Sequence, residues 1–234
     1  MSKKILITGA NGFVGSYLTE EALHEGFKVY AGIRKTSKTS YLKHLPVEYL
    51  YLDFEDKARL KESLKNHQFD YIIHNAGLTQ SKNSLEFDKM NFRLTANFVD
   101  VLTDNNLIPE KFIYNSSLSA YGPGKNESGQ PVKITDKQNP ITLYGKSKLR
   151  AQNYLYKNKG FPVIIFMPTA IYGPRERNFA MVYKLLLKGI EPYMGFKMQQ
   201  LTFIYVKDIA RLFITALKSD ISRGLYFVSD GHVY

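Results

Sequence analysis

The residues that most clearly suggest chemistry are a tyrosine and a lysine four positions apart, Tyr144 and Lys148. The surrounding apolar residues have helical spacing, so both side chains should lie on one helix face, one turn apart. A free phenol has a pKa of about 10, and a nearby ammonium lowers it by favouring the phenolate. We therefore expect Tyr144 to act as a general acid or base on a carbonyl or hydroxyl group. Taken alone, such a pair is also common by chance.

A cluster of serines follows the strand-like segment Lys111–Asn115. A serine at the carboxyl edge of a parallel sheet faces the ligand crevice and can stabilise charge on a reacting oxygen. Serines at strand ends are also ordinary turn formers and caps. The chain has no cysteine, and its five histidines lack the spacing of metal ligands. We therefore predict no metal site and no cysteine nucleophile, and interpret the histidines as structural.

Three glycines follow the first predicted strand in the pattern Gly9-x-x-Gly12-x-x-Gly15, and an amphipathic segment comes next. Gly9 permits a tight turn, Gly12 lets a pyrophosphate approach the backbone, and Gly15 lets the helix pack on the strand. The free N–H groups at the helix start attract phosphates. Because strand, turn and helix occur in this order, we predict a dinucleotide-binding turn rather than a glycine-rich turn without a ligand.

Arg34 directly follows the second predicted strand, at the place where a carboxylate would bind the ribose 2′-hydroxyl of NAD. Arginine can instead hold a 2′-phosphate in a bidentate fork, so Arg34 favours NADP, with NAD as the alternative. A solvated basic loop is the simpler interpretation. Asp53 follows the third predicted strand, where it could accept from the adenine amino group or cap a turn or helix.

The elements that must position these residues alternate between strand and helix. The predicted strands are Lys4–Thr8, Phe27–Ile33, Val47–Leu52, Tyr71–His74, Lys111–Asn115 and Val163–Met167, with a weaker pair at Leu201–Ile204 and Leu225–Val228. The predicted helices are Gly12–Glu25, Asp56–Asn66, Ser84–Asn105, Leu143–Asn158, Ala180–Leu187 and Lys207–Lys218. The strands are almost wholly apolar, which is typical of strands buried on both faces. Together they predict an α/β fold: a doubly wound, mainly parallel sheet with helices on both faces. The long loop Gly122–Asn139 is typical of functional loops.

Composition sets limits on the function. The chain has 234 residues, of which 44% are hydrophobic and 23% charged, as in ordinary globular proteins. No apolar run approaches the roughly 18 residues of a membrane span, so we expect no membrane partner. The absence of cysteine fits a reducing compartment, and we expect a cytoplasmic protein. The formal net charge of +11 suggests an anionic partner such as a phosphorylated small molecule or nucleic acid.

In these motifs the chain resembles the extended short-chain dehydrogenase/reductase superfamily, in its NAD(P)-dependent epimerase/dehydratase group. The resemblance covers essentially the whole chain, and the motifs occur in the family's order. They are Thr8-Gly-x-x-Gly-x-x-Gly15, Asp53, His74-Asn-Ala-Gly77, Asn91, Ser116-Ser117 with Tyr121-Gly122, Tyr144 with Lys148, Pro168-Thr-Ala-Ile-Tyr-Gly-Pro174 and Phe203-Ile-Tyr-Val-Lys-Asp208. The resemblance implies a Rossmann fold and an enzyme.

The resemblance also implies roles for individual residues. The catalytic set would be Ser117, Tyr144 and Lys148, with Lys148 also holding the nicotinamide ribose. The predicted cofactor-binding residues are Gly9, Asn11, Gly12, Phe13, Val14, Gly15, Arg34, Asp53, Phe54, Ala76, Gly77, Asn91, Ser116, Tyr144, Lys148, Pro168 and Ile171. The predicted substrate-facing residues are Thr79, Ser119 and Tyr121.

Departures from the family pattern shape the functional prediction. Met167 stands where an arginine is common, and Leu118 and Ser119 stand where dehydratases carry acidic residues, which argues against dehydration. With Arg34, this favours an NADP-dependent oxidoreductase that moves a hydride between nicotinamide and a carbonyl or secondary alcohol. The first alternative is a sugar-nucleotide epimerase that uses the same residues and retains its dinucleotide. A second alternative is a non-catalytic dinucleotide sensor; dispersed basic residues make nucleic-acid binding a weaker expectation.

The resemblance also implies an organisation for the chain. We expect a Rossmann domain at residues 1–174 and a reduced substrate-binding region at residues 175–234, interleaved with the last Rossmann helix and strand. That substrate-binding region looks short against the family, as if truncated. By analogy, the helices Ser84–Asn105 and Leu143–Asn158 would pair two copies into a homodimer.

Overall fold

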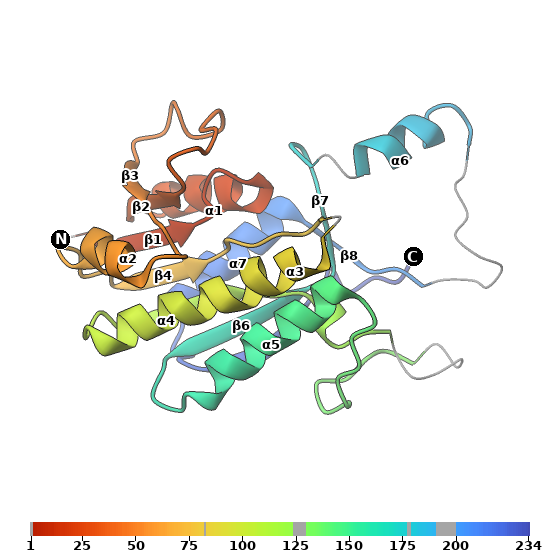
Figure 1. Ribbon diagram of the computed structural model, residues 1–234. Coiled ribbons are helices and arrows are strands. Elements are labelled where there is room, and N and C mark those ends of the chain that lie inside the picture. Colours follow the sequence, from red (N-terminus) through yellow and green to blue (C-terminus); the bar gives the residue numbers. More distant parts are fainter. Residues whose placement is uncertain (1, 82, 124–129, 177–178, 191–199) are drawn as a thin grey trace.

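The sheet at the centre of the computed structural model has seven parallel strands (Figure 1). The structure describes residues 2–81, 83–123, 130–176, 179–190 and 200–234. The strand order is β3-β2-β1-β4-β5-β6-β9. The strands of this sheet are β1 Lys4–Thr8, β2 Lys28–Ile33, β3 Glu48–Tyr51, β4 Tyr71–His74, β5 Lys111–Asn115, β6 Val163–Pro168 and β9 Gly224–Val228. A second, two-stranded parallel sheet pairs β7 (Ala170–Tyr172) with β8 (Phe203–Tyr205). This confirms the predicted doubly wound α/β fold.

Helices connect the strands. They are α1 Phe13–His24, α2 Lys57–Leu64, α3 Ser84–Phe87, α4 Leu94–Asp104, α5 Leu143–Lys157, α6 Phe179–Leu186 and α7 Val206–Lys218. A six-residue π-helical segment, Asp88–Arg93, joins α3 to α4, and a short 3-10 turn covers Leu118–Ala120. The helix predicted at Ser84–Asn105 therefore contains a π segment that apolar spacing did not indicate. Such segments occur frequently at functional sites.

Two apolar cores lie on opposite faces of the sheet. Ile5, Ile7 and their neighbours pack under α1 and α7, whereas Leu6 and Ile72 pack under α2, α4 and α5. Successive residues of a strand point to opposite faces, so each central strand contributes to both cores. In Figure 1, α4 and α5 lie side by side over the second core. The edge strand β3 is different, because most of its side chains are exposed, and the prediction that Val47–Leu52 is buried on both faces was wrong there.

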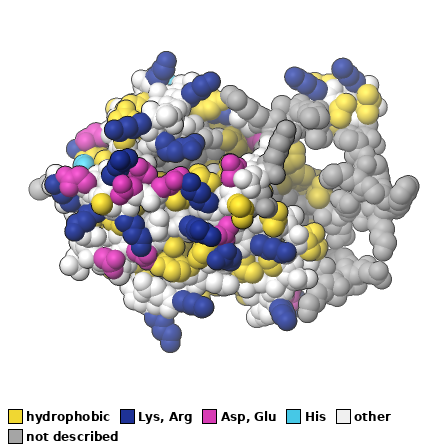
Figure 2. Space-filling view, in the orientation of Figure 1, with side chains coloured by type: hydrophobic (Ala, Val, Ile, Leu, Met, Phe, Trp, Pro, Cys, Tyr) yellow, Lys and Arg dark blue, Asp and Glu magenta, His cyan; other side chains and the backbone are white. Residues whose placement is uncertain are grey.

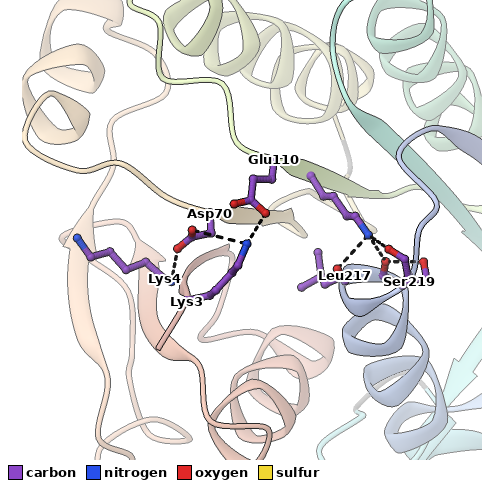
Figure 3. A network of polar contacts seen from close by, with 8 residues as sticks. Lys3, Lys4, Asp70, Glu110, Leu217 and Ser219 are labelled. Carbon is purple, nitrogen blue, oxygen red and sulfur yellow. Dashed lines mark hydrogen bonds and ion pairs between the residues drawn. The ribbon is translucent and has the colours of Figure 1, made fainter. Parts of the chain in front are cut away.

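Cations cap the carboxyl ends of two helices. Lys111 Nζ, at the start of β5, donates to the carbonyls of Ala216 (3.2 Å), Leu217 (3.0 Å) and Ser219 at the end of α7. Figure 3 shows the Leu217 and Ser219 carbonyls at this helix end, with Lys3, Asp70 and Glu110 beside them as a second charged group. Helix carbonyls at this end lack partners within the helix, so a buried end needs such donors.

Arg223 caps the carboxyl end of α5 in the same way. Its guanidinium donates to the carbonyls of Tyr156 (2.6 Å), Asn158 (3.0 Å) and Phe161 (2.7 Å). The two cations thus connect the last turns of α5 and α7 to neighbouring strands.

A further arginine joins the segment after β7 to the first helix. Arg175 has a backbone φ of +75°, which is rare for residues other than glycine. Its guanidinium donates to Ser16 Oγ (2.9 Å) and Glu20 Oε1 (2.7 Å). It also lies 4.4 Å from the ring centre of Tyr17 and 4.9 Å from that of Tyr41. This one side chain therefore connects α1, the loop before β3 and the loop after β7.

Several element boundaries differ from the prediction. The three-residue strand β7 was not predicted, since Ala170–Tyr172 is too short to give a pattern. Residues 124–129 of the predicted loop Gly122–Asn139 lie outside the described residues. The predicted division at residue 174 stays a prediction, but α7 packs on α1 and β9 completes the main sheet. None of the helices in the described part of the chain has the length and apolarity to cross a membrane.

Candidate active site

The glycine turn after β1 is held by close backbone packing. Gly9 has a φ of +65°, a conformation that side chains rarely adopt. A Cβ on Gly9 would lie 2.9 Å from Ala76 Cα, and a Cβ on Gly15 would lie 2.0 Å from the Gly9 carbonyl oxygen. Both positions therefore require glycine. The turn ends at the first residue of α1, Phe13, so the free N–H groups of α1 open beside it.

The basic turn after β2 lies next to the glycine turn. The Arg34 backbone N–H donates to Ser37 Oγ (3.1 Å), and the Ser37 N–H donates to the Arg34 carbonyl (2.9 Å). Asn11 Nδ2 in turn donates to the Lys38 carbonyl at 3.2 Å. Arg34 is exposed, and within the described ranges no carboxylate forms an ion pair with it. The guanidinium is thus available to a ligand that occupies the glycine turn.

Asp53 and Phe54 follow the edge strand β3, which lies beside β2. Asp53 accepts from the Glu55 N–H (3.2 Å) and lies 3.5 Å from Arg59. Asp56, rather than Asp53, caps α2, so the helix-cap interpretation of Asp53 was wrong and the turn interpretation fits. The ring of Phe54 packs edge-on against His74, 5.8 Å between ring centres.

A buried histidine positions the loop after β4. The Ala76 N–H donates to Thr8 Oγ1 at 3.1 Å, and Thr8 Oγ1 contacts His74 Nδ1 at 2.9 Å. His74 Nε2 contacts Thr95 Oγ1 at 2.9 Å, and that hydroxyl donates to the Asn91 carbonyl at 2.9 Å. These directions fit a neutral ring with its proton on Nε2, because each threonine hydroxyl then uses its hydrogen once. Burial, aided by the charge of Lys148, lowers the pKa of His74 to about 3. The structural interpretation of His74 fits this network.

Asn91 connects the same loop to α5. Its side chain is buried in the π segment; Oδ1 accepts from the Leu78 N–H at 2.7 Å. Its Nδ2 donates to the Leu78 carbonyl (2.9 Å) and to Ser147 Oγ (3.0 Å). Asn91 therefore fixes the strip 75–78 against the helix that carries Tyr144 and Lys148. Gly77 and Thr79, on this strip and just beyond it, are exposed.

Lys148 is buried beneath this strip, with 4% of its surface exposed. Its ammonium donates to the Asn115 carbonyl at 2.8 Å and lies 4.9 Å from the ring centre of Tyr114. A Cβ on Gly77 would come within 3.3 Å of Nζ, so the glycine leaves room for the ammonium. Burial lowers the pKa of Lys148 to about 7.

Tyr144 and Ser117 complete the group. The Ser117 side chain lies close enough to the Tyr144 phenol to affect its pKa, and Lys148 Nζ lies 6.0 Å from the Tyr144 ring centre. Burial raises the pKa of Tyr144, an effect that the Ser117 side chain partly opposes. The lowered pKa that we expected for Tyr144 is therefore not found in the chain alone, because burial of the phenol raises it. Ser117 Oγ also accepts from the Ser119 N–H at 3.2 Å.

Other predicted residues occupy less open positions. Ser116 is buried, and its hydroxyl accepts from Gln152 Nε2 at 2.5 Å. Tyr121 is also buried: its hydroxyl donates to the Ile134 carbonyl at 3.0 Å, and its ring packs edge-on against Phe227. A substrate contact of Tyr121 stays a prediction and would require this bond to open. Pro168 is buried at the end of β6, and Ile171 pairs with a residue of β8.

Sequence reasoning missed two asparagines, Asn75 and Asn115. Asn115 Nδ2 donates to Asn75 Oδ1 at 2.8 Å, and Asn75 Nδ2 donates to the Gly9 carbonyl at 3.4 Å. The available signal was their position, since each adjoins a predicted motif residue, Ala76 and Ser116. The pairing itself depends on strand register, which residue types do not reveal.

The described residues fit a dinucleotide. The turn requires glycine at two positions and faces the start of a helix, which is the form of a phosphate cradle. Asn115 Oδ1 is a buried acceptor without a donor among the residues that the structure describes. Gly9, Arg34 and Ala76 follow the carboxyl ends of the neighbouring strands β1, β2 and β4, and Lys148 contacts the carboxyl end of β5 through the Asn115 carbonyl.

Known proteins give a consistent comparison. UDP-glucose 4-epimerase of Vibrio cholerae is 27% identical over an alignment of 245 positions, gaps included, and the alignment covers 99% of this chain and 72% of the relative. A solved UDP-N-acetylglucosamine 4-epimerase of Methanobrevibacter ruminantium, in complex with UDP-N-acetylmuramic acid, has a TM-score of 0.83 at 26% identity and covers 100% of this chain and 78% of that one. A solved UDP-glucose 4-epimerase of Thermus thermophilus with NAD has a TM-score of 0.84 at 22% identity, over 99% of this chain and 79% of that one.

The family comparison extends over nearly the same range as the motifs. A sequence model described as the NAD dependent epimerase/dehydratase family matches residues 5–227, from β1 to β9. The fold, the motif order and this match agree. The chain is therefore an enzyme of the NAD-dependent epimerase/dehydratase family.

Proposed function

We propose that the protein is a sugar-nucleotide epimerase that holds a nicotinamide dinucleotide throughout its catalytic cycle. The observation that carries this proposal is the convergence of Ser117, Tyr144 and Lys148 beside a glycine turn built for phosphates. The similarity to solved and curated sugar-nucleotide epimerases favours this reaction over the simple oxidoreductase that the sequence alone suggested. No acidic side chain stands between Ser116 and Tyr121, which argues against dehydration.

The chain's own residues would manage the proton. Tyr144 has a raised pKa and is therefore a neutral phenol in the resting protein, ready to donate to a substrate carbonyl or, once deprotonated, to accept from a hydroxyl. Ser117, whose side chain lies beside the Tyr144 phenol, would orient the reacting oxygen. Lys148 has a pKa of about 7, and in its protonated form it would offset the negative charge of the Tyr144 phenolate. A bound dinucleotide would supply the hydride chemistry.

Turnover and cofactor retention test this proposal. An epimerase should keep its dinucleotide through purification and convert a UDP-sugar into its epimer without net NADH or NADPH formation. Tyr144→Phe should abolish this conversion and leave dinucleotide binding largely intact, because its hydroxyl is needed for proton transfer whereas the other predicted cofactor contacts remain. Stoichiometric release of reduced dinucleotide would support the oxidoreductase instead, and full turnover by Tyr144→Phe would remove this residue from the mechanism.

We also propose that the dinucleotide is NADP. The exposed Arg34 has no carboxylate partner within the described ranges, and the Asn11–Lys38 hydrogen bond fixes its turn beside the glycine turn. Arg34→Ala should weaken NADP binding by roughly tenfold and leave NAD nearly unchanged, since only NADP carries the 2′-phosphate. Calorimetric titration measures both, with Lys43→Ala as a control for loss of one exposed charge. Equal affinity of the wild type for both dinucleotides, unchanged by Arg34→Ala, would favour NAD.

The remaining expectations are also proposals. They are a homodimer that pairs through α4 and α5, and a cytoplasmic location. Figure 2 shows that Lys and Arg side chains on the visible face are interspersed with Asp and Glu rather than gathered into one basic stripe. This distribution supports a small-molecule function over nucleic-acid binding on that face.

A further inference from the structure

Asn115 lies between the cofactor turn and the catalytic lysine. It is the last residue of β5, and 8% of its surface is exposed. Its backbone carbonyl accepts from Lys148 Nζ, and its side-chain amide reaches Asn75. Asn75 in turn contacts the carbonyl of Gly9. Asn115 therefore contacts both the catalytic lysine and the asparagine that binds the glycine turn.

The orientation of both amides follows from the Gly9 carbonyl, which can only accept. Asn75 must present its NH₂ group to that carbonyl, so its Oδ1 faces Asn115. Asn115 must then present its own NH₂ group to Asn75 Oδ1. This leaves Asn115 Oδ1 as the acceptor at the end of this series of hydrogen bonds, and among the described residues no donor reaches it. A buried acceptor without a donor is unfavourable, so the site is built for a donor from elsewhere.

The chemistry of a dinucleotide restricts what this donor is. The pyrophosphate that the glycine turn would hold has no donor at neutral pH, so it cannot pair with Oδ1. Ribose hydroxyls are donors, and Lys148, bound to the same asparagine, is the residue predicted to hold the nicotinamide-side ribose. The position of Asn115, between the Gly9 turn and Lys148, corresponds to the part of the ligand between pyrophosphate and nicotinamide.

We propose that Asn115 is a cofactor-binding residue whose Oδ1 accepts a hydrogen bond from a hydroxyl of the nicotinamide-side ribose. Asn75 acts as a positioning residue, since it fixes the direction of the Asn115 amide against the Gly9 turn. This inference rests on the dinucleotide site of the proposed function and is independent of which substrate is epimerised.

Ligand fragments test the assignment by calorimetric titration. ADP-ribose carries the second ribose, whereas ADP lacks it, and their 2′-phosphorylated counterparts serve if the protein prefers NADP. For the wild type, ADP-ribose should bind more tightly than ADP. Asn115→Leu should lower this affinity ratio by about tenfold, the effect of one hydrogen bond to a buried group. Asn75→Leu should lower the same ratio by a smaller factor, because Oδ1 is still present but the Asn115 amide loses the bond that fixes its direction.

Further variants keep the test decisive if Asn115→Leu does not fold. Asn115→Ser removes Oδ1, is too short to reach the ribose and should lower the affinity ratio. Asn115→Asp keeps Oδ1 but loses the NH₂ group that donates to Asn75, so it should weaken both fragments and leave the ratio above that of Asn115→Ser. An unchanged ratio in Asn115→Leu or Asn115→Ser would overturn the proposal, as would a wild type that binds ADP-ribose no more tightly than ADP. Because no turnover is measured, a failure of the epimerase proposal would leave this result standing.

Discussion

Lys148 shows how strongly burial alters a single side chain at this site. The amine would have a pKa of 10.5 in water, and burial lowers it to about 7. The Asn115 carbonyl and the Tyr114 ring compensate the buried charge only in part. The folded chain therefore carries a lysine that is close to losing its proton at neutral pH, which suits a partner of a proton-transferring tyrosine.

This shift predicts a pH dependence of stability. Below about pH 7, Lys148 is protonated in the folded and the unfolded chain, and the full cost of burying its charge is present. Between about pH 7 and 10.5 the unfolded chain holds a proton that the folded chain has released, so this residue's contribution to the free energy of unfolding rises with pH. The wild type should therefore gain stability relative to Lys148→Met as the pH rises through this range.

Chemical denaturation at several pH values measures the difference between the two proteins. The exposed Lys146→Met, on the same helix, is the control for general effects of losing a lysine. A difference between wild type and Lys148→Met that stays constant with pH would contradict the assigned pKa.

Residue types and spacing predicted part of this site. Tyr144 and Lys148 could be found because one helical turn separates them, and Ser117 because the resemblance aligned it. The direction of the Tyr144 pKa shift could not be found, since desolvation depends on residues distant in sequence. The Asn75–Asn115 pair escaped for the same reason: it forms only when β4 and β5 are neighbours.

At the scale of elements, capping holds the helices that position the site. The Lys111 side chain, from the first residue of β5, caps α7 on the opposite side of the sheet from α5. Strand β5 thus begins beside the end of α7 and ends at Asn115, just before the serine cluster. The carbonyls at this end of α7 would otherwise lack these bonds in a half-buried position.

Lys111→Met should therefore lower the free energy of unfolding by about 2 kcal/mol, the loss of several bonds to one charged donor. That corresponds to a decrease in melting temperature of several degrees for a chain of this size. Differential scanning calorimetry measures it, and Lys61→Met, an exposed lysine in α2, serves as the control. Identical melting temperatures for Lys111→Met and the control would show that the cap contributes little.

Elements with a strong pattern were predicted well, and those without one were not. The first six strands of the main sheet are short and bounded by turn residues, so all six could be placed from sequence. The exposed edge strand β3 was misjudged because its tyrosines look equally apolar whether buried or not. The π segment and β7 left no signature, since both depend on packing against distant residues.

At the scale of the whole molecule, Arg175 unites parts that lie far apart in sequence. Its positive φ is strained for an arginine, so the contacts with Ser16, Glu20, Tyr17 and Tyr41 must compensate for that conformation. Tyr41 lies in the same loop as the basic turn that we propose binds the 2′-phosphate. Arg175 thus links the ordering of that loop to the segment after β7.

Arg175→Ala should loosen both segments while the central sheet stays intact. We expect backbone amides of residues 35–45 and 173–176 to exchange hydrogen roughly tenfold faster, with little change in β1 and β4. Hydrogen-exchange mass spectrometry measures this, with Arg211→Ala as the control, because Arg211 is exposed and forms an ion pair with Asp208 of the same helix. Equal protection of the two segments in wild type and Arg175→Ala would show that the loop is ordered by other contacts.

The order of strands in the main sheet has a consequence for the protein during its synthesis. The wholly buried strand β6 pairs with β5 on one side and with β9 on the other. All residues of the second sheet, and helix α7, are translated between β6 and β9. Until β9 leaves the ribosome, β6 presents an unpaired apolar edge, which is a template for aggregation. A ribosome that stalls before residue 224 should therefore hold a chain that depends on chaperones, although all the proposed cofactor-binding residues have already been translated.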